Sequence, residues 1–539
     1  MLQPSRRRCA AAGAAVALTF AATAAAQPGG APDRGPNTSV GPYVIPAAEG
    51  VKTTSLLTVG DEPASNGYKM VGIPDGMGAF RRKGDRFNIV LNHELRTNQG
   101  VVRRHGQKGA LVSKLRIDAR TLEVTAGSDL IDPGVQYWDY VSQMLSATAS
   151  LGGPNPRSAG DAFVAQSNEF ARFCSGALTD AGQLFNEDSG RGYDGQIYFA
   201  NEENGDEGRV FGVTEDGTAQ QLPRLGLFSW ENALAAYNTS DTTLVMGQED
   251  AATGQLWAYV GRKSKRGSAF RRAGLTNGAG NVINVVDGLS KANPAHVSTD
   301  AEYRAAYGKG KAIEVELSEV DWDQSGARQN AEAAADGLTL NRIEDGAWDP
   351  RWRHRNDFYF LTTEGQTGAP SPTGLTGRDG GGLWRLSFED REHPEDGATL
   401  TLLLDGSEAP FLNKPDNMTI DKRGNLLIQE DPGKNVSVAR IVAYDIATGR
   451  RGVVATFDPD LFAPATPGGE DAKITVDEES SGIIPTDQQL GKGTFLFDAQ
   501  IHPAKSDGSY NDGTEPTGEE AEKGQLLVLR VKDFEKVYE

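Results

Sequence analysis

Six stretches of the chain end an apolar run in acid or amide residues, which are side chains that can bind cations or move protons. Each stretch is followed by a Gly-rich turn and a second apolar run. The first copy reads FNIVLNHE, and the six copies are 87–94, 196–204, 242–250, 357–364, 424–431 and 493–500. If these runs are strands of a closed ring, their terminal oxygens converge on one axis.

The candidate ligands are the acids and amides that end these runs, together with acidic residues just ahead of some of them. Like charges that lie a few ångströms apart raise one another's pKa or hold a metal ion. Oxygen-only ligand sets favour Ca²⁺ or Mg²⁺ over Zn²⁺. For a single copy, a solvated strand end is the simpler interpretation, whereas paired acids in several copies favour a metal. The predicted metal ligands are Asn92, Glu94, Asn201, Glu202, Glu203, Asn204, Glu231, Glu249, Asp250, Glu344, Asp416, Glu430 and Asp431.

Arg342 is the cation that stands out, because it lies two residues before Glu344 in NRIEDGAWDP. An arginine beside metal-binding carboxylates can clamp a phosphate or a carboxylate through two parallel hydrogen bonds. The alternative is a structural ion pair with Asp345 or with an acid of a neighbouring repeat.

Histidine and cysteine give weaker signals. His93 and His502 stand near the first and last copies, and either can be a general base or simply a packed side chain. Cys174, in EFARFCSGAL, has no histidine or second cysteine near it in the sequence. We therefore interpret Cys174 as a small buried hydrophobic residue rather than a metal ligand.

The repetition predicts an all-β fold. A pair of strands cannot bury its own apolar face, so copies must stand beside it, and antiparallel units repeated at this scale close into a ring. We expect a six-bladed β-propeller, one domain over residues 51–539, with helical and loop insertions over one face. Helices are expected near 140–147 and over 327–338, the second ending at Gly337.

Composition and the N-terminus indicate where the protein works. The 539 residues carry a formal net charge of −20, which repels phosphate backbones and anionic lipids and argues against nucleic-acid or membrane-surface binding. Residues 1–26 are typical of an export signal peptide, with three arginines at positions 6–8 before an Ala-rich stretch. The twin-arginine and the general secretion routes both remain open. We expect a flexible arm over 27–50 and a periplasmic or secreted monomer.

The order of these motifs resembles that of the PhoX-type alkaline phosphatases, which are exported bacterial β-propellers. The resemblance covers nearly all of the mature chain, and eight motifs in the same order make it fairly specific. The matching pieces are Asn92-His93-Glu94, Glu202-Glu203-Asn204, LGLFSWE (225–231), MGQED (246–250), Arg342-Ile343-Glu344-Asp345, YFLTTE (359–364), Pro415-Asp416-Asn417 and Gln429-Glu430-Asp431.

The resemblance implies a metal-dependent phosphoester hydrolase with iron and calcium clustered at the channel mouth. It implies that Arg342 and Glu344 are catalytic, with Arg342 holding the phosphate of a small phosphorylated substrate. The acidic ligands that it implies are Glu202, Glu231, Glu249, Asp250, Glu344 and Glu430. The chain departs from the family at Asn201, where the family carries a cysteine whose thiolate bridges the irons. An amide oxygen cannot replace a bridging thiolate, so the sequence predicts calcium and argues against iron.

Two other functions stay open at this stage. One is a calcium-dependent esterase or lactonase that acts on an ester substrate. The other is a non-catalytic propeller that calcium stabilises and that binds a ligand or a partner. A propeller fold alone does not separate these three functions.

Overall fold

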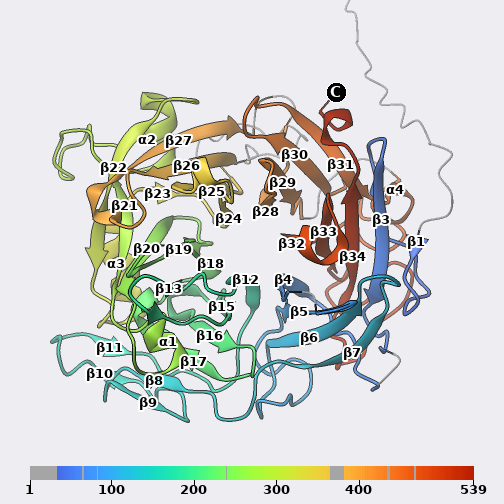
Figure 1. Ribbon diagram of the computed structural model, residues 1–539, viewed down its shortest axis with the longest axis horizontal. Helices are drawn as coiled ribbons and strands as arrows, with labels where there is room; N and C mark the ends of the chain where they lie inside the picture. The colour runs from blue at the N-terminus through green and yellow to red at the C-terminus, as the bar shows by residue number, and fades with distance from the viewer. Residues whose placement is uncertain are drawn as a thin grey trace, which may run out of the picture.

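The sheets divide into six units of four consecutive antiparallel strands, or blades, which surround a central axis (Figure 1). The computed structural model describes residues 33–63, 66–81, 83–237, 239–364, 381–406, 408, 411–433, 438–465 and 469–538. The export signal expected at 1–26 and residues 27–32 of the expected arm lie outside these ranges. The six-bladed propeller predicted from the repeat is confirmed.

The strands of each blade follow one another from the axis outward. Blade one contains β4 (Pro74–Ala79), β5 (Arg86–His93), β6 (Leu111–Asp118) and β7 (Val124–Asp129), and blade two contains β12 (Phe173–Leu178), β15 (Ile197–Glu202), β16 (Val210–Thr214) and β17 (Ala219–Gln221). Blade three contains β18 (Trp230–Ala235), β19 (Thr242–Glu249), β20 (Gly254–Arg262) and β21 (Ala279–Val285), and blade four contains β24 (Ile343–Trp348), β25 (Asp357–Thr362), β26 (Gly382–Phe388) and β27 (Ala398–Asp405). Blade five contains β28 (Pro415–Ile420), β29 (Asn425–Glu430), β30 (Arg440–Asp445) and β31 (Arg451–Phe457), and blade six contains β32 (Glu478–Pro485), β33 (Thr494–Ile501), β34 (Lys523–Val531) and β3 (Val51–Thr58).

Both ends of the chain meet in blade six and close the ring. The N-terminal strand β3 pairs antiparallel with the C-terminal strand β34. The segment expected to be a flexible arm instead extends two blades, because β1 (Asp33–Arg34) pairs with β3 and β2 (Val44–Pro46) pairs with β31. Val44 is fully buried there, which explains why this part of the segment is held.

The apolar runs of the repeat are the second and third strands of the blades. These strands are buried on both faces because each blade packs against its two neighbours, so their sequences are nearly continuous apolar runs. Each of the six interfaces between described blades has its own cluster of buried apolar side chains. Between blades four and five, for example, Tyr359 and Leu383 pack against Leu426 and Ile428.

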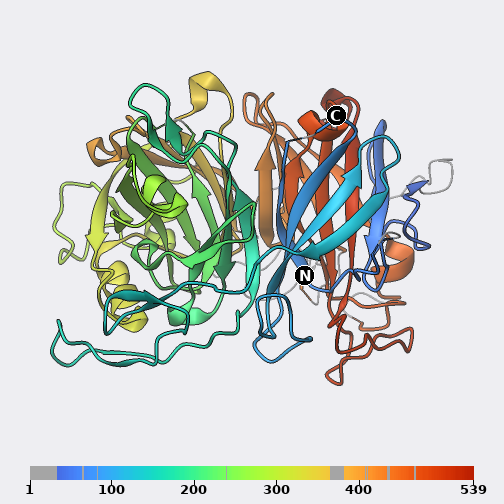
Figure 2. The same cartoon turned by 60° about the horizontal axis from the view of Figure 1, so that its bottom comes forward.

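Long insertions gather on one face of the ring, as the sequence predicted, and they form the lower face in Figure 2. They include the connections between blades one and two, with β8 (Tyr137–Asp139), β9 (Met144–Ser146), β10 (Gly153–Pro154) and β11 (Ala162–Phe163). The helix expected over 327–338 is confirmed as α3 (Gly326–Asp336). The helix expected near 140–147 is wrong, because Asp139 accepts hydrogen bonds from the backbone of Val141 and from Ser142 and turns the chain into the β8–β9 hairpin.

The remaining elements are short connections outside the blades. They are α1 (Ala269–Arg272), α2 (Asp300–Ala306), α4 (Pro459–Phe462), α5 (Asp487–Leu490), β13 (Phe185–Asn186), β14 (Arg191–Gly192), β22 (Ile313–Val320), β23 (Thr339–Leu340), and the 3₁₀ turns Gly205–Glu207, Pro223–Leu225, Trp352–His354, Pro394–Asp396 and Phe534–Lys536. Of these, β22 pairs with both β21 and β27 and so joins the outer edges of blades three and four. Among the described residues, no helix has the length and apolar character needed to cross a membrane.

A register shift interrupts each inner strand. In β12, Phe173 pairs with Glu202 and Gly176 pairs with Ala200, so the inner strand has one extra residue in this interval. A bulge of this kind releases side chains from the ladder and re-aims them. Equivalent shifts lie between Pro74 and Met77, Trp230 and Ala233, Ile343 and Gly346, Pro415 and Met418, and Ser481 and Ile484.

The bulges of blades one and two pack so closely that Gly76 has no room for a side chain. A Cβ atom on Gly76 would lie 1.8 Å from the backbone nitrogen of Gly176. We expect Gly76→Ala to lower the free energy of unfolding by about 3 kcal/mol, measured by denaturant titration, because the two blades must separate.

The matched control is Gly518→Ala, where the new Cβ meets no atom within 4 Å. This variant should stay within about 0.5 kcal/mol of the parent protein. Equal stabilities of the two variants would show that the blades are not in tight contact at this bulge.

Candidate metal centre

The first residue of the bulge carries an acid or a thiol in five of the six described inner strands. These residues are Asp75, Cys174, Glu231, Glu344 and Asp416. Their ligand atoms form overlapping groups, within each of which all atoms lie within 4.8 Å of one another. The groups are Asp75–Glu94–Cys174, Cys174–Glu203–Glu231 and Glu231–Glu344–Asp416. Because they share Cys174 and Glu231, we treat these seven residues as one site, the axial cluster.

Cys174 lies inside the axial cluster and not in an apolar environment. Its Sγ donates to Glu231 Oε2 at 3.0 Å and to Asp75 Oδ2 at 3.4 Å. The interpretation of Cys174 as an inert hydrophobic residue is therefore wrong. Burial, together with the charges of Asp75 and Glu231, raises the pKa of the thiol well above its usual value. A metal ion that binds there must displace the thiol proton.

The carboxylates of the cluster disfavour one another's ionisation. Burial raises the pKa of Glu231 well above its usual value, and the charges of Asp416 and Glu344 raise it further. Burial and neighbouring acids also raise the pKa values of Asp75, Glu203, Glu344 and Asp416. Such a group of buried acids is stable only when protons or cations compensate the charges.

Two arginines lie beside the cluster in strained backbone conformations. Arg172 and Arg342 directly precede β12 and β24 and have φ angles of 42° and 54°, in the left-handed region. Arg342 donates to both oxygens of Asp250, at 2.8 and 3.0 Å, and its Nη2 lies 3.0 Å from Glu344 Oε1. Each left-handed residue costs on the order of 1 kcal/mol, which the surrounding contacts must offset.

Arg172 binds two acids in the same way. Its Nη1 donates to Glu203 at 3.0 Å, and its Nε donates to Glu94 at 2.9 Å. The side chains of Arg172 and Arg342 are 38% and 28% exposed, whereas those of Glu94 and Glu344 are 7% and 1% exposed. The two guanidinium groups therefore lie between the buried acids and the solvent.

Amide side chains beneath the acids present unpaired oxygens. Asn92 Nδ2 donates to the backbone oxygen of Cys174 at 2.7 Å, and Asn201 Nδ2 donates to that of Ser175 at 2.9 Å. Their Oδ1 atoms and that of Asn417 are buried and have no hydrogen-bond partner among the described residues. Buried unpaired oxygens are costly, and a cation is one group that would satisfy them.

Several predicted ligands do meet at the axis. Glu94, Glu203, Glu231, Glu344 and Asp416 belong to the axial cluster. Asp250 borders the cluster through Arg342, and Asp431 is the charged neighbour that most strongly raises the pKa of Asp416 after burial.

The structure does not bring the last acids of the second strands into the cluster. Glu202 accepts four hydrogen bonds, three of them from Arg209. Glu249 accepts from the backbone of Gln255 and from Trp257 Nε1, and Glu430 pairs with Arg440. In each case the acid binds the third strand of its own blade or the turn before it, so its oxygens are already occupied. Asn204 is exposed at the start of a 3₁₀ turn.

Of the two histidines singled out in the sequence, His93 is packed, whereas His502 is 29% exposed and lines a pocket with Glu94 and Arg172. His93 is fully buried between the backbone oxygen of Gly72 and Ser113 Oγ, and burial lowers its pKa to about 4. Burial alone would lower the pKa of His502, but its contact with Glu522 raises that pKa to about 9.

Sequence reasoning missed Asp75, Arg172 and Glu479. The signal for Asp75 was present, because residues 73–77, IPDGM, repeat the pattern of residues 414–418, KPDNM. Arg172 stands two residues before Cys174, just as Arg342 stands two residues before Glu344. Glu479 has its pKa raised by burial and by Asp431 and Asp416, which places it beside the cluster.

Comparisons with known proteins identify a family and a similar fold. A family model described as alkaline phosphatase PhoX matches residues 175–472, more than half of the chain. Pseudomonas fluorescens PhoX, solved with vanadate as a transition state analogue, is similar in fold, with a TM-score of 0.59 and 15% identity over 90% of this chain and 95% of that chain. The NanB sialidase of Streptococcus pneumoniae has a TM-score of 0.33 and 8% identity over 88% of this chain and 70% of its own. A search of curated proteins found no matching sequence.

Substitutions at two glutamates distinguish an acid that stabilises the fold from an acid that binds metal. We expect Glu202→Gln to lower the free energy of unfolding by about 3–5 kcal/mol, because it leaves Arg209 buried without its counter-charge, while bound metal is retained. Glu231→Gln should lose bound metal without a comparable loss of stability. Thermal melts and elemental analysis of both variants measure the two effects. Metal loss in Glu202→Gln at unchanged stability would restore Glu202 as a ligand.

The raised pKa of Glu231 predicts a pH dependence in metal-free protein. A group whose pKa is raised by folding stabilises the fold below its unfolded value, about 4.3, and this contribution is lost as the pH rises. In chelator, Glu231→Gln should therefore gain melting temperature relative to the parent protein as the pH rises from 4 to 8. A difference that is constant or shrinks over this range would contradict the charge repulsion.

Proposed function

Because the chain belongs to the PhoX alkaline phosphatase family, we propose that it is an exported, metal-dependent hydrolase of small phosphate monoesters that works at the axial cluster. The single observation that carries this proposal is the arrangement of buried acids and a thiol beneath two partly exposed arginines. The acids can bind metal cations and the arginines can bind a phosphate. The site therefore offers binding groups for the metal ions and for the substrate.

The residues of the axial cluster fit a mixed set of metal ions. Oxygen donors such as Glu231, Glu344 and Asp416 suit calcium, and the buried oxygens of Asn92 and Asn417 add neutral donors. The thiol of Cys174 suits a softer transition metal such as iron. The sequence argument against iron rested on Asn201, and it loses its basis because Cys174 supplies a thiol to the cluster.

The two arginines are the groups that would hold the phosphate. Each now spans two carboxylates, Arg342 between Asp250 and Glu344 and Arg172 between Glu94 and Glu203. Cations bound to these carboxylates would weaken the ion pairs and leave the guanidinium groups to pair with phosphate oxygens. The substrate would enter from the solvent side of the arginines, since the acids behind them are buried.

Bound metal ions would supply Lewis-acid stabilisation of the phosphoryl oxygens and activate the attacking water. The remaining tasks fall to this chain's own residues. Cys174 would have to lose its proton to hold a metal ion, so metal affinity would rise with pH. The hydrogen bonds of Asn92 and Asn201 to the backbone of the Cys174 bulge fix the position of the thiol.

Export and oligomeric state complete the proposal. Family membership and the signal-like residues 1–26 support a periplasmic or secreted location. The net charge of −20 favours small substrates over nucleic acids, whose phosphates it repels. We propose that the protein acts as a monomer, since the six blades complete one ring within a single chain.

Hydrolysis of p-nitrophenyl phosphate by protein loaded with calcium and iron tests the activity. We expect turnover that is lost on chelation, and Arg342→Ala should lower kcat/KM by about 10²–10³-fold because it removes a phosphate-binding cation. The control Arg450→Ala removes an exposed arginine paired with Glu535 and should leave kcat/KM unchanged. Hydrolysis of p-nitrophenyl acetate without any phosphate release would instead support an esterase.

A further inference from the structure

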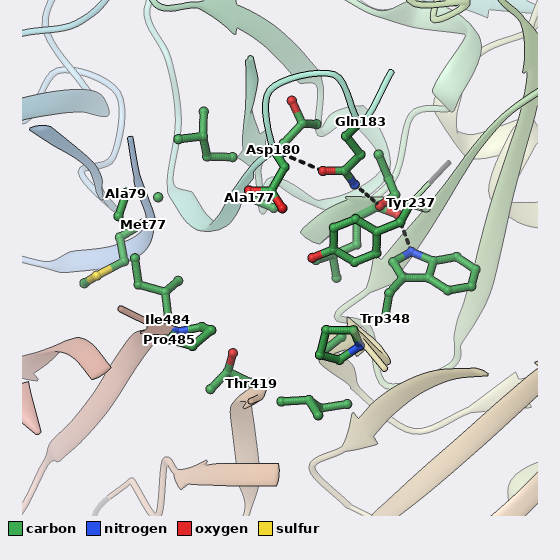
Figure 3. A pocket seen from close by; sticks show the side chains of 18 of the residues that line it. Met77, Ala79, Ala177, Asp180, Gln183, Tyr237, Trp348, Thr419, Ile484 and Pro485 are labelled. Carbon is green, nitrogen blue, oxygen red and sulfur yellow. Dashed lines mark hydrogen bonds between the residues drawn. The ribbon is translucent and has the colours of Figure 1, made fainter. Parts of the chain in front are cut away.

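A cavity of about 430 Å³ lies along the axis on the side of the bulges that faces away from the axial cluster (Figure 3). Every blade contributes to its wall from the part of the inner strand that follows the bulge. The contributing residues include Met77, Ala177, Leu234, Ala347, Thr419 and Ile484. The loops that join first and second strands surround its open end.

A layer of hydrogen bonds separates this cavity from the axial cluster. Asn232 Nδ2 donates to Asp345 Oδ1 at 2.7 Å, and Asn417 Nδ2 donates to Ser175 Oγ at 2.6 Å. Ser175, Asn232 and Asp345 form the floor of the cavity, whereas the residue before each of them points to the cluster. A molecule in the cavity would therefore lie apart from the metal ligands.

The deeper wall of the cavity is apolar. Met77 and Ile484 lie on one side of it in Figure 3, and the ring of Trp348 lies on the opposite side. Leu178 and Leu234, which are partly exposed, also line this wall. The volume and the apolar wall are typical of sites for small organic molecules.

Two hydroxyl groups face this space from different blades. Figure 3 shows the side chains of Tyr237, which follows β18, and Thr419, in β28, reaching into the cavity. Neither hydroxyl forms a hydrogen bond with the residues that the structure describes. Hydroxyls in an apolar cavity are the kind of sparse polar group that orients a bound ligand.

The open end of the cavity carries an excess of cations. Arg81, Arg355 and Lys422 line it, and none of them forms an ion pair with a described carboxylate. The guanidinium of Arg355 stacks on Trp352, 4.0 Å from the ring centre, and this ring is 72% exposed. Three acids also line this end, of which Asp487 accepts a backbone hydrogen bond from Gly493 and Asp349 pairs with Arg351 at 2.6 Å. The third is Asp180, which is exposed.

We propose that this cavity binds a compact aromatic carboxylate at a site distinct from the axial cluster. The ring lies in the apolar section between Ile484 and Trp348. The carboxylate accepts hydrogen bonds from Tyr237 and Thr419, and it faces the cations of the open end. The apolar wall and the ring of Trp348 favour an aromatic ring, and the hydroxyls together with the cations favour an anion.

Titration of the metal-loaded full chain with 2-naphthoate tests this site. We expect saturable binding with one site per chain, and at least tenfold weaker binding of neutral 2-naphthamide and of acetate. Tyr237→Phe and Thr419→Val should each weaken 2-naphthoate binding about five- to tenfold, since each removes a hydrogen bond to a charged group. Lys422→Ala should weaken binding of 2-naphthoate but not of 2-naphthamide.

The controls separate this site from the axial cluster and from general damage. Tyr193→Phe, which changes a tyrosine outside the cavity, should leave binding unchanged, and melting temperatures report whether each variant is folded. Chelation should abolish phosphoester hydrolysis but not 2-naphthoate binding. Absence of saturable binding, equal binding by Tyr237→Phe, Thr419→Val and the parent protein, or loss of binding on chelation would each overturn the proposal.

Discussion

Repulsion between buried carboxylates at the axis is the constraint on which the rest of the structure depends. The ring brings the first bulge residues of five blades to the same place, and tight packing between blades prevents these residues from moving apart. Glu231 and Glu344 are each at most 2% exposed, so water cannot screen their charges. The fold therefore requires protons or cations at its centre, and that requirement is also what suits it to bind metal ions.

The acids of the repeat divide into two classes according to how their charges are compensated. Glu202 and Glu430 meet Arg209 and Arg440 within their own blades, so they stabilise the ends of strands. In the axial cluster, Glu94 and Glu203 share Arg172, and Glu344 shares Arg342 with Asp250. Both arginines are partly exposed and held in strained conformations. An exposed arginine that is shared between two acids is available to a substrate, whereas Arg209, which is 4% exposed and holds Glu202, is not.

Much of the fold could be predicted from the sequence, but only part of the site could. The apolar runs gave the second and third strands of each blade, because strands buried on both faces read as continuous apolar segments. The inner strands were harder to recognise, since β4 reads PDGMGA and depends on close contact with its neighbours rather than on apolar content. Without the inner strands, the terminal acids of the second strands seemed to face the axis, and Glu249 was placed among the ligands. Its contact with Trp257 depends on how the turn between β19 and β20 folds.

Cys174 shows why local sequence was insufficient for the site itself. Its neighbours in the chain are apolar, but its contacts come from Asp75 and Glu231, which belong to the two adjacent blades. Asn201, at the position compared with the family cysteine, lies close to it in the fold and binds the backbone of the next residue, Ser175. The sequence indicated the amide of Asn201 at this place in the site. The thiol of Cys174 reaches the same place only because the ring closes.

A crystal structure of the protein purified from its native export route, with anomalous scattering data, tests the central claim most directly. Metal ions should lie within bonding distance of Cys174 Sγ and of the carboxylates of Glu231, Glu344 and Asp416. An axial cluster without any ion, with metal bound instead at Glu202, Glu249 or Glu430, would contradict it.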